Sequence, residues 1–185
     1  HQRIDDVKRL PDSKTREKAL RELQSKLRKA EKHRPQQVRY RMPYKIAVSN
    51  IALKGKIPAG DKRWGVFNDS FQNLELEPID IANAIYTGRS ITTWHNGRRS
   101  LDNFVLGQHI AVDMDSGDDR STFDTLMQHE FVQMYASMIY TTPSHTPQAP
   151  RSRILFLLDS IIEDINAYQQ AAKFVCSLFD GCDSA

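Results

Sequence analysis

Two aspartates, Asp113 and Asp115, stand at the end of an apolar, β-branched run over residues 109–115. The run predicts a buried strand that stops at the polar turn 116–119. Side chains two residues apart in a strand point to the same face. Two carboxylates there cannot both be buried without partners, because each charge would lose its hydration. A hard divalent cation, Mg²⁺ or Mn²⁺, would resolve the conflict. Exposed turn carboxylates that cap the next helix are the alternative, and Asp-x-Asp alone leaves both open.

A second group of polar residues follows a predicted strand over residues 137–142. Ser144 and His145 lie in a proline-rich loop, and Arg151 and Arg153 begin the next apolar run one pleat apart. A guanidinium fork matches phosphate oxygens. Taken singly, His145 also fits a loop histidine and the arginines fit an edge-strand pair. Together with the carboxylates, these residue types are the ones that phosphoryl or nucleotidyl transfer requires.

The elements that must position these residues follow from hydrophobic periodicity. Strands are predicted at 38–49, 90–95, 109–115, 137–142 and 152–158, and helices at 78–86, 122–135 and 163–179. Residues 64–71 favour a short strand or extended loop, and Asn96-Gly97 is a turn signal. The order strand–helix–strand–strand–helix from residue 109 predicts an α/β (α+β) fold, with helices packed on a mixed sheet.

The front of the chain differs from the rest in charge. Residues 1–63 hold 19 Lys and Arg against 7 Asp and Glu, whereas residues 64–185 hold 7 against 16. A helix predicted over 13–33 carries only a narrow apolar stripe, so we divide the chain into a basic helical appendage, 1–36, and a core, 37–185. The asymmetry suggests a polyanion-binding surface beside a metal site. Charge alone favours the alternative, a solvated basic helix beside an acidic surface.

The remaining sequence features narrow the class of protein. No run approaches the length needed to cross a membrane, so we expect no membrane partner. Cys176 and Cys182 are the only cysteines and suggest neither a disulfide scaffold nor a zinc site. A reducing cytoplasm is therefore the expected location. Because the chain starts at His1 and stops soon after Asp183, we expect it to be a part of something longer.

Three motifs together resemble the archaeo-eukaryotic primase superfamily. The run that ends in Asp113-Met-Asp115 is similar to its first motif. Ser144-His145-Thr146, followed by an arginine-bearing strand, is similar to the second motif of plasmid, phage and CRISPR-associated primase-polymerases. The third motif, a hydrophobic residue before an aspartate, fits Cys182-Asp183. Asp159 competes for this place, but the family has a helix before its third aspartate, and residues 163–179 supply one.

The resemblance implies a primase-polymerase core with a sheet like that of RNA-recognition motifs. It implies two Mg²⁺ or Mn²⁺ ions held by Asp113, Asp115 and Asp183, with His145 joining these three as a catalytic residue. Nucleoside triphosphates would contact phosphate-binding side chains of the second motif, namely Ser144, His145, Arg151 and Arg153. DNA template or primer would contact basic residues near the start of the core, namely Arg39, Arg41, Lys45, Lys54, Lys56, Lys62 and Arg63, with strong salt sensitivity. Trp64 or Trp94 could stack a base.

Two departures from the family pattern bear on this interpretation. The family continues past its third aspartate with a basic strand, and this chain stops there. The more familiar second motif carries its histidine on the strand, where Arg153 stands here, which leaves open whether His145 or Arg153 touches the triphosphate. A metal-dependent nuclease and a non-catalytic nucleic-acid-binding module are the rival functions. A helicase or a CRISPR-associated protein, fused or separate, is the expected protein partner.

Overall fold

The computed structural model describes residues 43–182. These residues belong to one compact unit, residues 42–185. The predicted helix over 13–33, together with Arg39, Arg41 and Asp183, lies outside the described residues. Every helix, strand and contact of the fold described therefore belongs to residues 43–182.

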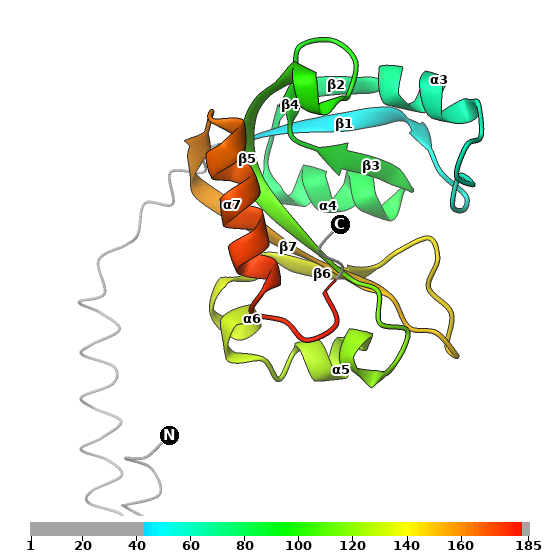
Figure 1. The fold of residues 1–185 in the computed structure, drawn as a ribbon, viewed down its shortest axis with the longest axis vertical. Helices are drawn as coiled ribbons and strands as arrows, with labels where there is room; N and C mark the ends of the chain where they lie inside the picture. Colours follow the sequence, from blue (N-terminus) through cyan, green and yellow to red (C-terminus); the bar gives the residue numbers. More distant parts are fainter. Residues whose placement is uncertain (1–42, 183–185) are drawn as a thin grey trace, which may run out of the picture. The chain divides into compact units, whose positions relative to one another are not determined.

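Two antiparallel sheets form the framework (Figure 1). The first sheet has the order β2 (Phe71–Leu76), β1 (Tyr44–Ala52), β3 (Arg89–Thr92). The second has the order β4 (Trp94–His95), β5 (Phe104–Met114), β7 (Ser152–Ile162), β6 (Met138–Thr141). Every ladder between these strands is antiparallel. The predicted α/β class is confirmed, but the expected mixed sheet is wrong.

The antiparallel pairing has a topological reason. Helices connect β5 to β6 and follow β7, yet β7 lies between β5 and β6 in the sheet. In the second sheet, the two strands joined through helices, β5 and β6, are therefore not neighbours. Cys182 forms an isolated antiparallel bridge with Met114 after the last helix. From β5 onward the described unit thus follows the order strand, helices, strand, strand, helix, and it ends in the single-residue bridge of Cys182.

The helices agree with the sequence in part. The predicted helix 78–86 is confirmed as α4 (Pro78–Tyr86), and 163–179 contains α7 (Ile165–Cys176), capped by Asp164. In α4 the buried residues are Ile81 and Ala84, whereas Ile79 is 64% exposed.

Two segments differ from the prediction. Residues 64–71 were expected to be extended but contribute to the helix α3 (Arg63–Asp69). The single helix predicted over 122–135 is instead a short turn of helix, α5 (Phe123–Leu126), followed by α6 (Glu130–Tyr135). Short 3₁₀ turns, η1 (Leu101–Asn103) and η2 (Asp119–Ser121), flank β5.

Two hydrophobic cores cover the two faces of the second sheet. Ile110, Val112 and Met114 of β5 point into a core with α5, α6 and α7. On the other face, Leu155 of β7 packs into a core with β1 and α4. Because side chains alternate along a strand, the odd-numbered residues of β5 and β7 face the first sheet. That face carries Asp113 and Arg153.

Candidate active site

Strand β5 positions the two predicted carboxylates. Val112 and Met114 are 2% and 1% exposed, whereas Asp113 and Asp115 are partly exposed on the opposite face. The alternation predicted from the sequence is therefore confirmed. The turn after Asp115 is fixed by a network in which Ser116 and Ser121 hydroxyls lie 2.7 Å apart. Ser152 donates to the Ser121 carbonyl at 2.7 Å.

Strand β7 places an arginine directly against the first carboxylate. Asp113 and Arg153 are register partners. Arg153 Nη2 donates to Asp113 Oδ2 at 2.7 Å, and Arg153 Nε donates to Asp113 Oδ1. Burial, the largest single cause, acts to lower the pKa of Arg153, but the hydrogen bonds and charge interactions with Asp113 and Tyr140 together raise that pKa above its ordinary value. Both carboxylate oxygens of Asp113 thus accept hydrogen bonds from the guanidinium of Arg153.

The second carboxylate is held by the other predicted arginine. Arg151 Nη1 donates to Asp115 Oδ2 at 3.0 Å. The backbone N–H of Arg151 donates to His145 Nδ1 at 3.1 Å. In a neutral ring this contact puts the imidazole proton on Nε2. The contact also ties His145, in the loop between β6 and β7, to Arg151, the residue directly before β7.

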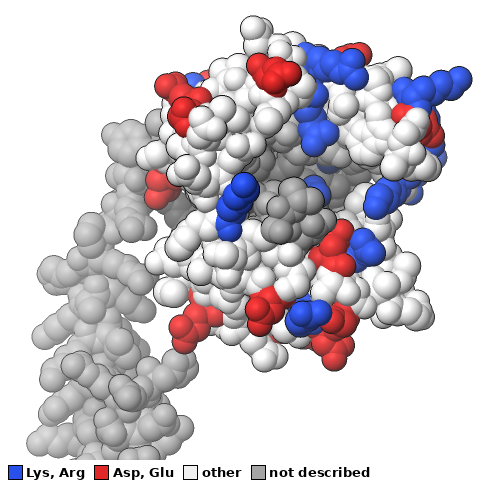
Figure 2. All heavy atoms as spheres, viewed as in Figure 1, with Lys and Arg blue, Asp and Glu red and all other residues white. Residues whose placement is uncertain are grey.

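Four of the predicted metal-binding and phosphate-binding residues line one cleft, which has a volume of about 290 Å³. Its polar lining brings Asp113 and Asp115 together with Ser144 and Arg153, the grouping expected from the sequence. Apolar side chains of the first sheet and its loops form much of the remaining wall, namely Leu53, Ile57, Trp64, Phe67, Phe71 and Ile91. Figure 2 shows a hollow on one face of the described unit, with Lys and Arg side chains around it.

Other predicted residues lie beside the cleft or apart from it. His145 is exposed in its loop, and neither it nor Arg151 lines the cleft. Lys56 lines the cleft, and Lys54 lines an adjoining pocket with it. Lys45 lies with its ammonium 5.1 Å from the centroid of the Trp94 ring.

Asp159 does not belong to this site. It is exposed on β7, six residues beyond Arg153, which corresponds to about 20 Å along an extended strand. Of the two candidates for a third carboxylate, Asp159 is therefore excluded by distance. Asp183 lies outside the described residues, but its neighbour Cys182 is the bridge partner of Met114, which stands between Asp113 and Asp115.

Three polar residues of the cleft were not predicted from the sequence, namely Ser90, Arg99 and Thr142. Thr142 Oγ1 is buried, and within residues 43–182 it has no hydrogen-bond partner. The sequence offered a weak signal for Arg99, since a basic pair follows the Asn96-Gly97 turn. For Thr142 it offered only proximity to the Ser-His-Thr loop.

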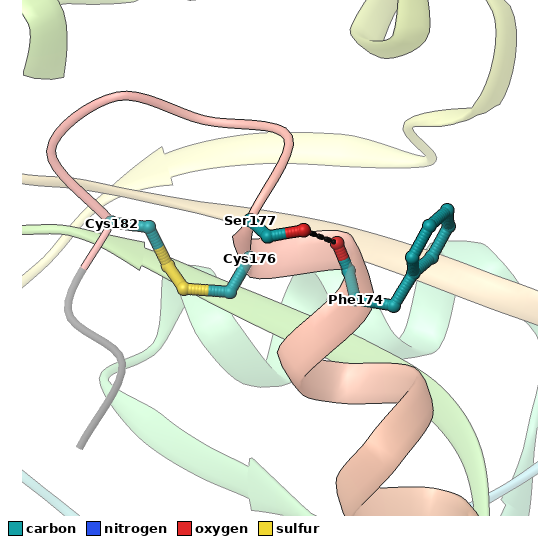
Figure 3. Close-up of a disulfide and its surroundings, with 4 residues drawn as sticks. All are labelled: Phe174, Cys176, Ser177 and Cys182. Carbon is teal, nitrogen blue, oxygen red and sulfur yellow. Dashed lines mark hydrogen bonds between the residues drawn. A yellow bond between two sulfur atoms is a disulfide. The ribbon is translucent and has the colours of Figure 1, made fainter.

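A disulfide holds the chain segment that leads toward Asp183. Cys176, the last residue of α7, is bonded to Cys182 (Figure 3). The expectation that these cysteines form no disulfide is wrong, because the turn after α7 returns Cys182 to the helix end with a Cα–Cα distance of 5.7 Å. Gly181 has a φ of 89°, and a Cβ there would lie 3.0 Å from Ser116 Cβ. The segment therefore packs closely against the turn that follows Asp115.

We expect reduction of this disulfide to destabilise the unit. Closure of a six-residue separation corresponds to about 2 kcal/mol in the chain-entropy model. Treatment with dithiothreitol should therefore lower the thermal midpoint, measured by circular dichroism, by roughly 5–10 °C. The variant Cys176→Ser should show the lowered midpoint without reductant and no further response to it. A wild-type midpoint that reductant leaves unchanged would contradict this expectation.

A buried histidine lies four residues before Asp113 on the same face of β5. His109 is 3% exposed, and its Nδ1 has no hydrogen-bond partner within the described residues. Burial, and next the charge of Arg153, lower the pKa of His109 to about 4. The charged imidazolium is therefore strongly disfavoured in the folded state.

This histidine should make stability depend on pH. The unfolded chain binds the proton near pH 6.5, whereas the folded chain resists it until about pH 4. Stability attributable to His109 is therefore intact above pH 6.5 and falls by up to about 3 kcal/mol as the pH drops to 4. Urea unfolding at pH 7 and pH 4.5 should show a smaller loss in His109→Leu than in wild type. His145→Gln serves as the control, and equal losses in all three proteins would argue against this role of His109.

Comparison with known proteins identifies no relatives. No protein-family model, no curated protein and no solved structure matches the chain. In residues 43–182, no helix combines the length and apolar character needed to cross a bilayer. Within the same residues, no group of three or more His, Cys, Asp or Glu side chains is arranged to hold a metal ion. The site is therefore interpreted from its own geometry.

Proposed function

We propose that residues 37–185 are the core of a primase-polymerase, a template-dependent nucleotidyltransferase that makes and extends primers from nucleoside triphosphates. The observation that carries this proposal is the single cleft lined by Asp113, Asp115, Ser144 and Arg153. These residues come from β5, from β7 and from the loop between β6 and β7, so the shared lining is a property of the fold. The order strand, helices, strand, strand, helix from β5 onward, with the Cys182 bridge beside β5, supports the sheet type that the motif resemblance implies.

The donor set fits divalent cations if a third carboxylate joins it. Asp113 and Asp115 offer hard oxygen ligands on one face of β5. The bridge between Met114 and Cys182 supports Asp183 as the third. Two Mg²⁺ or Mn²⁺ ions held by these aspartates would activate a 3′-hydroxyl and neutralise phosphate charge.

The arginines act on the nucleotide's phosphates in this proposal. Arg151 and Arg153 pair with the carboxylates in the described structure, and phosphate oxygens suit the same guanidinium geometry. Arg153 lines the cleft. In the proposed complex its guanidinium releases the Asp113 carboxylate and binds a nucleotide phosphate, and the Ser144 hydroxyl donates a hydrogen bond to the same phosphates. His145 accepts the Arg151 N–H and so acts as a positioning residue for the loop.

In this proposal, DNA binds to the basic residues near the start of the core. Lys54 and Lys56 stand at the cleft and its adjoining pocket, and Arg39 and Arg41 precede them in sequence. Lys45 stands on β1. Phosphate contacts by these residues would make DNA binding fall steeply with salt. A helicase or CRISPR-associated partner and a cytoplasmic location stay predictions from sequence alone.

Incorporation of nucleotides tests the proposal. The chain is incubated with MnCl₂ or MgCl₂, a primed and an unprimed single-stranded DNA template, and either deoxynucleotides or ribonucleotides. We expect template-dependent products longer than the primer, and dinucleotide or longer products without primer. Chelation by EDTA should abolish both.

The products of this incubation, together with DNA-binding and nucleotide-binding measurements, distinguish the rival functions. Shortening of the DNA without any extension would replace the proposal with a metal-dependent nuclease. DNA binding that EDTA leaves unchanged, without extension, shortening or nucleotide binding, would identify a non-catalytic binding module. The ion pairs now formed by both carboxylates are the observation that favours this last rival.

A further inference from the structure

Arg99 differs from most of the described arginines in what it contacts. Within residues 43–182, five arginines form an ion pair with an aspartate, namely Arg63, Arg98, Arg120, Arg151 and Arg153. Arg89 and Arg99 instead contact neutral groups. Of these two, only Arg99 lines the cleft. Its charge is therefore held at the site without a carboxylate partner among the described residues.

Neutral contacts fix the position of this side chain. Arg99 Nη1 donates to Asn68 Oδ1 at 3.2 Å, and the Arg99 backbone N–H donates to the Asn68 carbonyl at 2.9 Å. The guanidinium carbon lies 5.6 Å from the centroid of the Phe71 ring. A guanidinium stacked on an aromatic face loses part of its freedom before any ligand arrives. The cation is thus oriented in advance.

The electrostatic surroundings of Arg99 are unfavourable without an anion. The residue is exposed overall, but it lines the cleft with its guanidinium over the Phe71 ring, and partial desolvation, and next the charge of Arg153, lower its pKa. Lys56 adds a third cation to the same lining, against two carboxylates that already have arginine partners. An anion entering the cleft would relieve this repulsion between like charges.

We propose that Arg99 binds the phosphate tail of the incoming nucleoside triphosphate, from the wall of the cleft formed by Phe71. The proposal rests on the proposed function, because it assumes that the cleft takes a nucleotide. The phosphates would lie between Arg99 on one wall and Arg153 on the strand that faces it. Arg99 would thereby hold the substrate while the β7 arginine contacts it from the other side.

Nucleotide binding to matched variants tests this role. Calorimetry measures binding of a non-hydrolysable nucleoside triphosphate, the corresponding nucleoside, and a single-stranded oligonucleotide to the full chain in MgCl₂. Arg99→Ala should weaken triphosphate binding by about tenfold to a hundredfold, the range expected for charge-assisted hydrogen bonds. It should leave nucleoside and oligonucleotide binding unchanged, and Arg99→Lys should restore part of the loss.

Arg98→Ala is the matched control. It removes the same charge from the residue next to Arg99, and Arg98 itself forms an exposed ion pair with Asp69. It should bind all three ligands as wild type does. Wild-type triphosphate affinity in Arg99→Ala would overturn the inference while leaving the proposed function intact. Loss of oligonucleotide binding alone would also overturn it, since the arginine would then serve the DNA strand. Absence of triphosphate binding in wild type would overturn both.

Discussion

The variant Asp113→Asn is expected to lose at least about a hundredfold in primer extension while keeping the fold. An amide preserves the shape of the side chain, and its one carbonyl oxygen still accepts a hydrogen bond from Arg153. It lacks the negative charge that a divalent cation requires. The effect should therefore fall on cation binding and turnover, and only weakly on unfolding.

Three measurements separate these effects. Primer extension gives the rate, electron paramagnetic resonance of Mn²⁺ gives cation binding, and urea unfolding gives stability. Mn²⁺ affinity should fall at least about tenfold. Asp115→Asn should behave in the same way, because it lies on the same face of β5 and in the same cleft.

Asp118→Asn is the matched control for this pair. Asp118 also pairs with an arginine, Arg120, at 2.7 Å, but it lies outside the lining of the cleft. The variant should extend primers at the wild-type rate. Primer extension at the wild-type rate by Asp113→Asn would contradict the assignment of Asp113 and Asp115 as metal ligands. An equal loss of primer extension in Asp118→Asn would contradict it as well.

The face of β5 that carries the carboxylates could be predicted because it depends on local sequence. A run with β-branched residues forms a strand, and alternation then separates Met114 from its two acidic neighbours. The helix 78–86 was predictable for a similar reason, since Pro78 can occupy its first turn.

Elements that depend on distant contacts were not predictable. Residues 64–71 contain aromatic and β-branched types that favour a strand, yet Phe67 is buried between Trp64 and Phe71 in the helical arrangement. Tertiary packing overrides the local preference there. The break between α5 and α6 contains neither glycine nor proline. His129, which lies at this break, contacts the Leu178 carbonyl and the ring of Phe179, both about fifty positions away in the chain.

The contacts that define the candidate site are also long-range. Asp113 meets Arg153 across 40 positions, which follows only from the register of β5 against β7. Arg99 reaches the cleft because the loop after β4 packs on Phe71 and Asn68. A motif order can indicate that such residues belong together, but the pairing of each carboxylate with a particular arginine requires the fold.

Because Asp113 pairs with Arg153, we expect Arg153→Ala to weaken nucleotide binding and to strengthen Mn²⁺ binding. In Arg153→Ala the phosphate tail loses a guanidinium, so the KM for nucleotide should rise by about tenfold to a hundredfold. The same change releases both oxygens of Asp113 from a competing cation. Mn²⁺ should therefore bind the nucleotide-free variant more tightly than it binds wild type.

Stability gives the third measurement on this variant. The side chains of Arg153 and Asp113 are 32% and 37% exposed, so solvent screens the charge left unpaired. We expect a loss of about 1–3 kcal/mol in urea unfolding, below the range for fully buried pairs. Arg120→Ala breaks the exposed pair with Asp118 and should cost less stability than Arg153→Ala, because solvent and salt screen an exposed ion pair. It should leave KM and Mn²⁺ affinity unchanged. An Arg153→Ala variant with unchanged KM and lowered stability would show that the arginine holds the two strands together and takes no part in binding nucleotide.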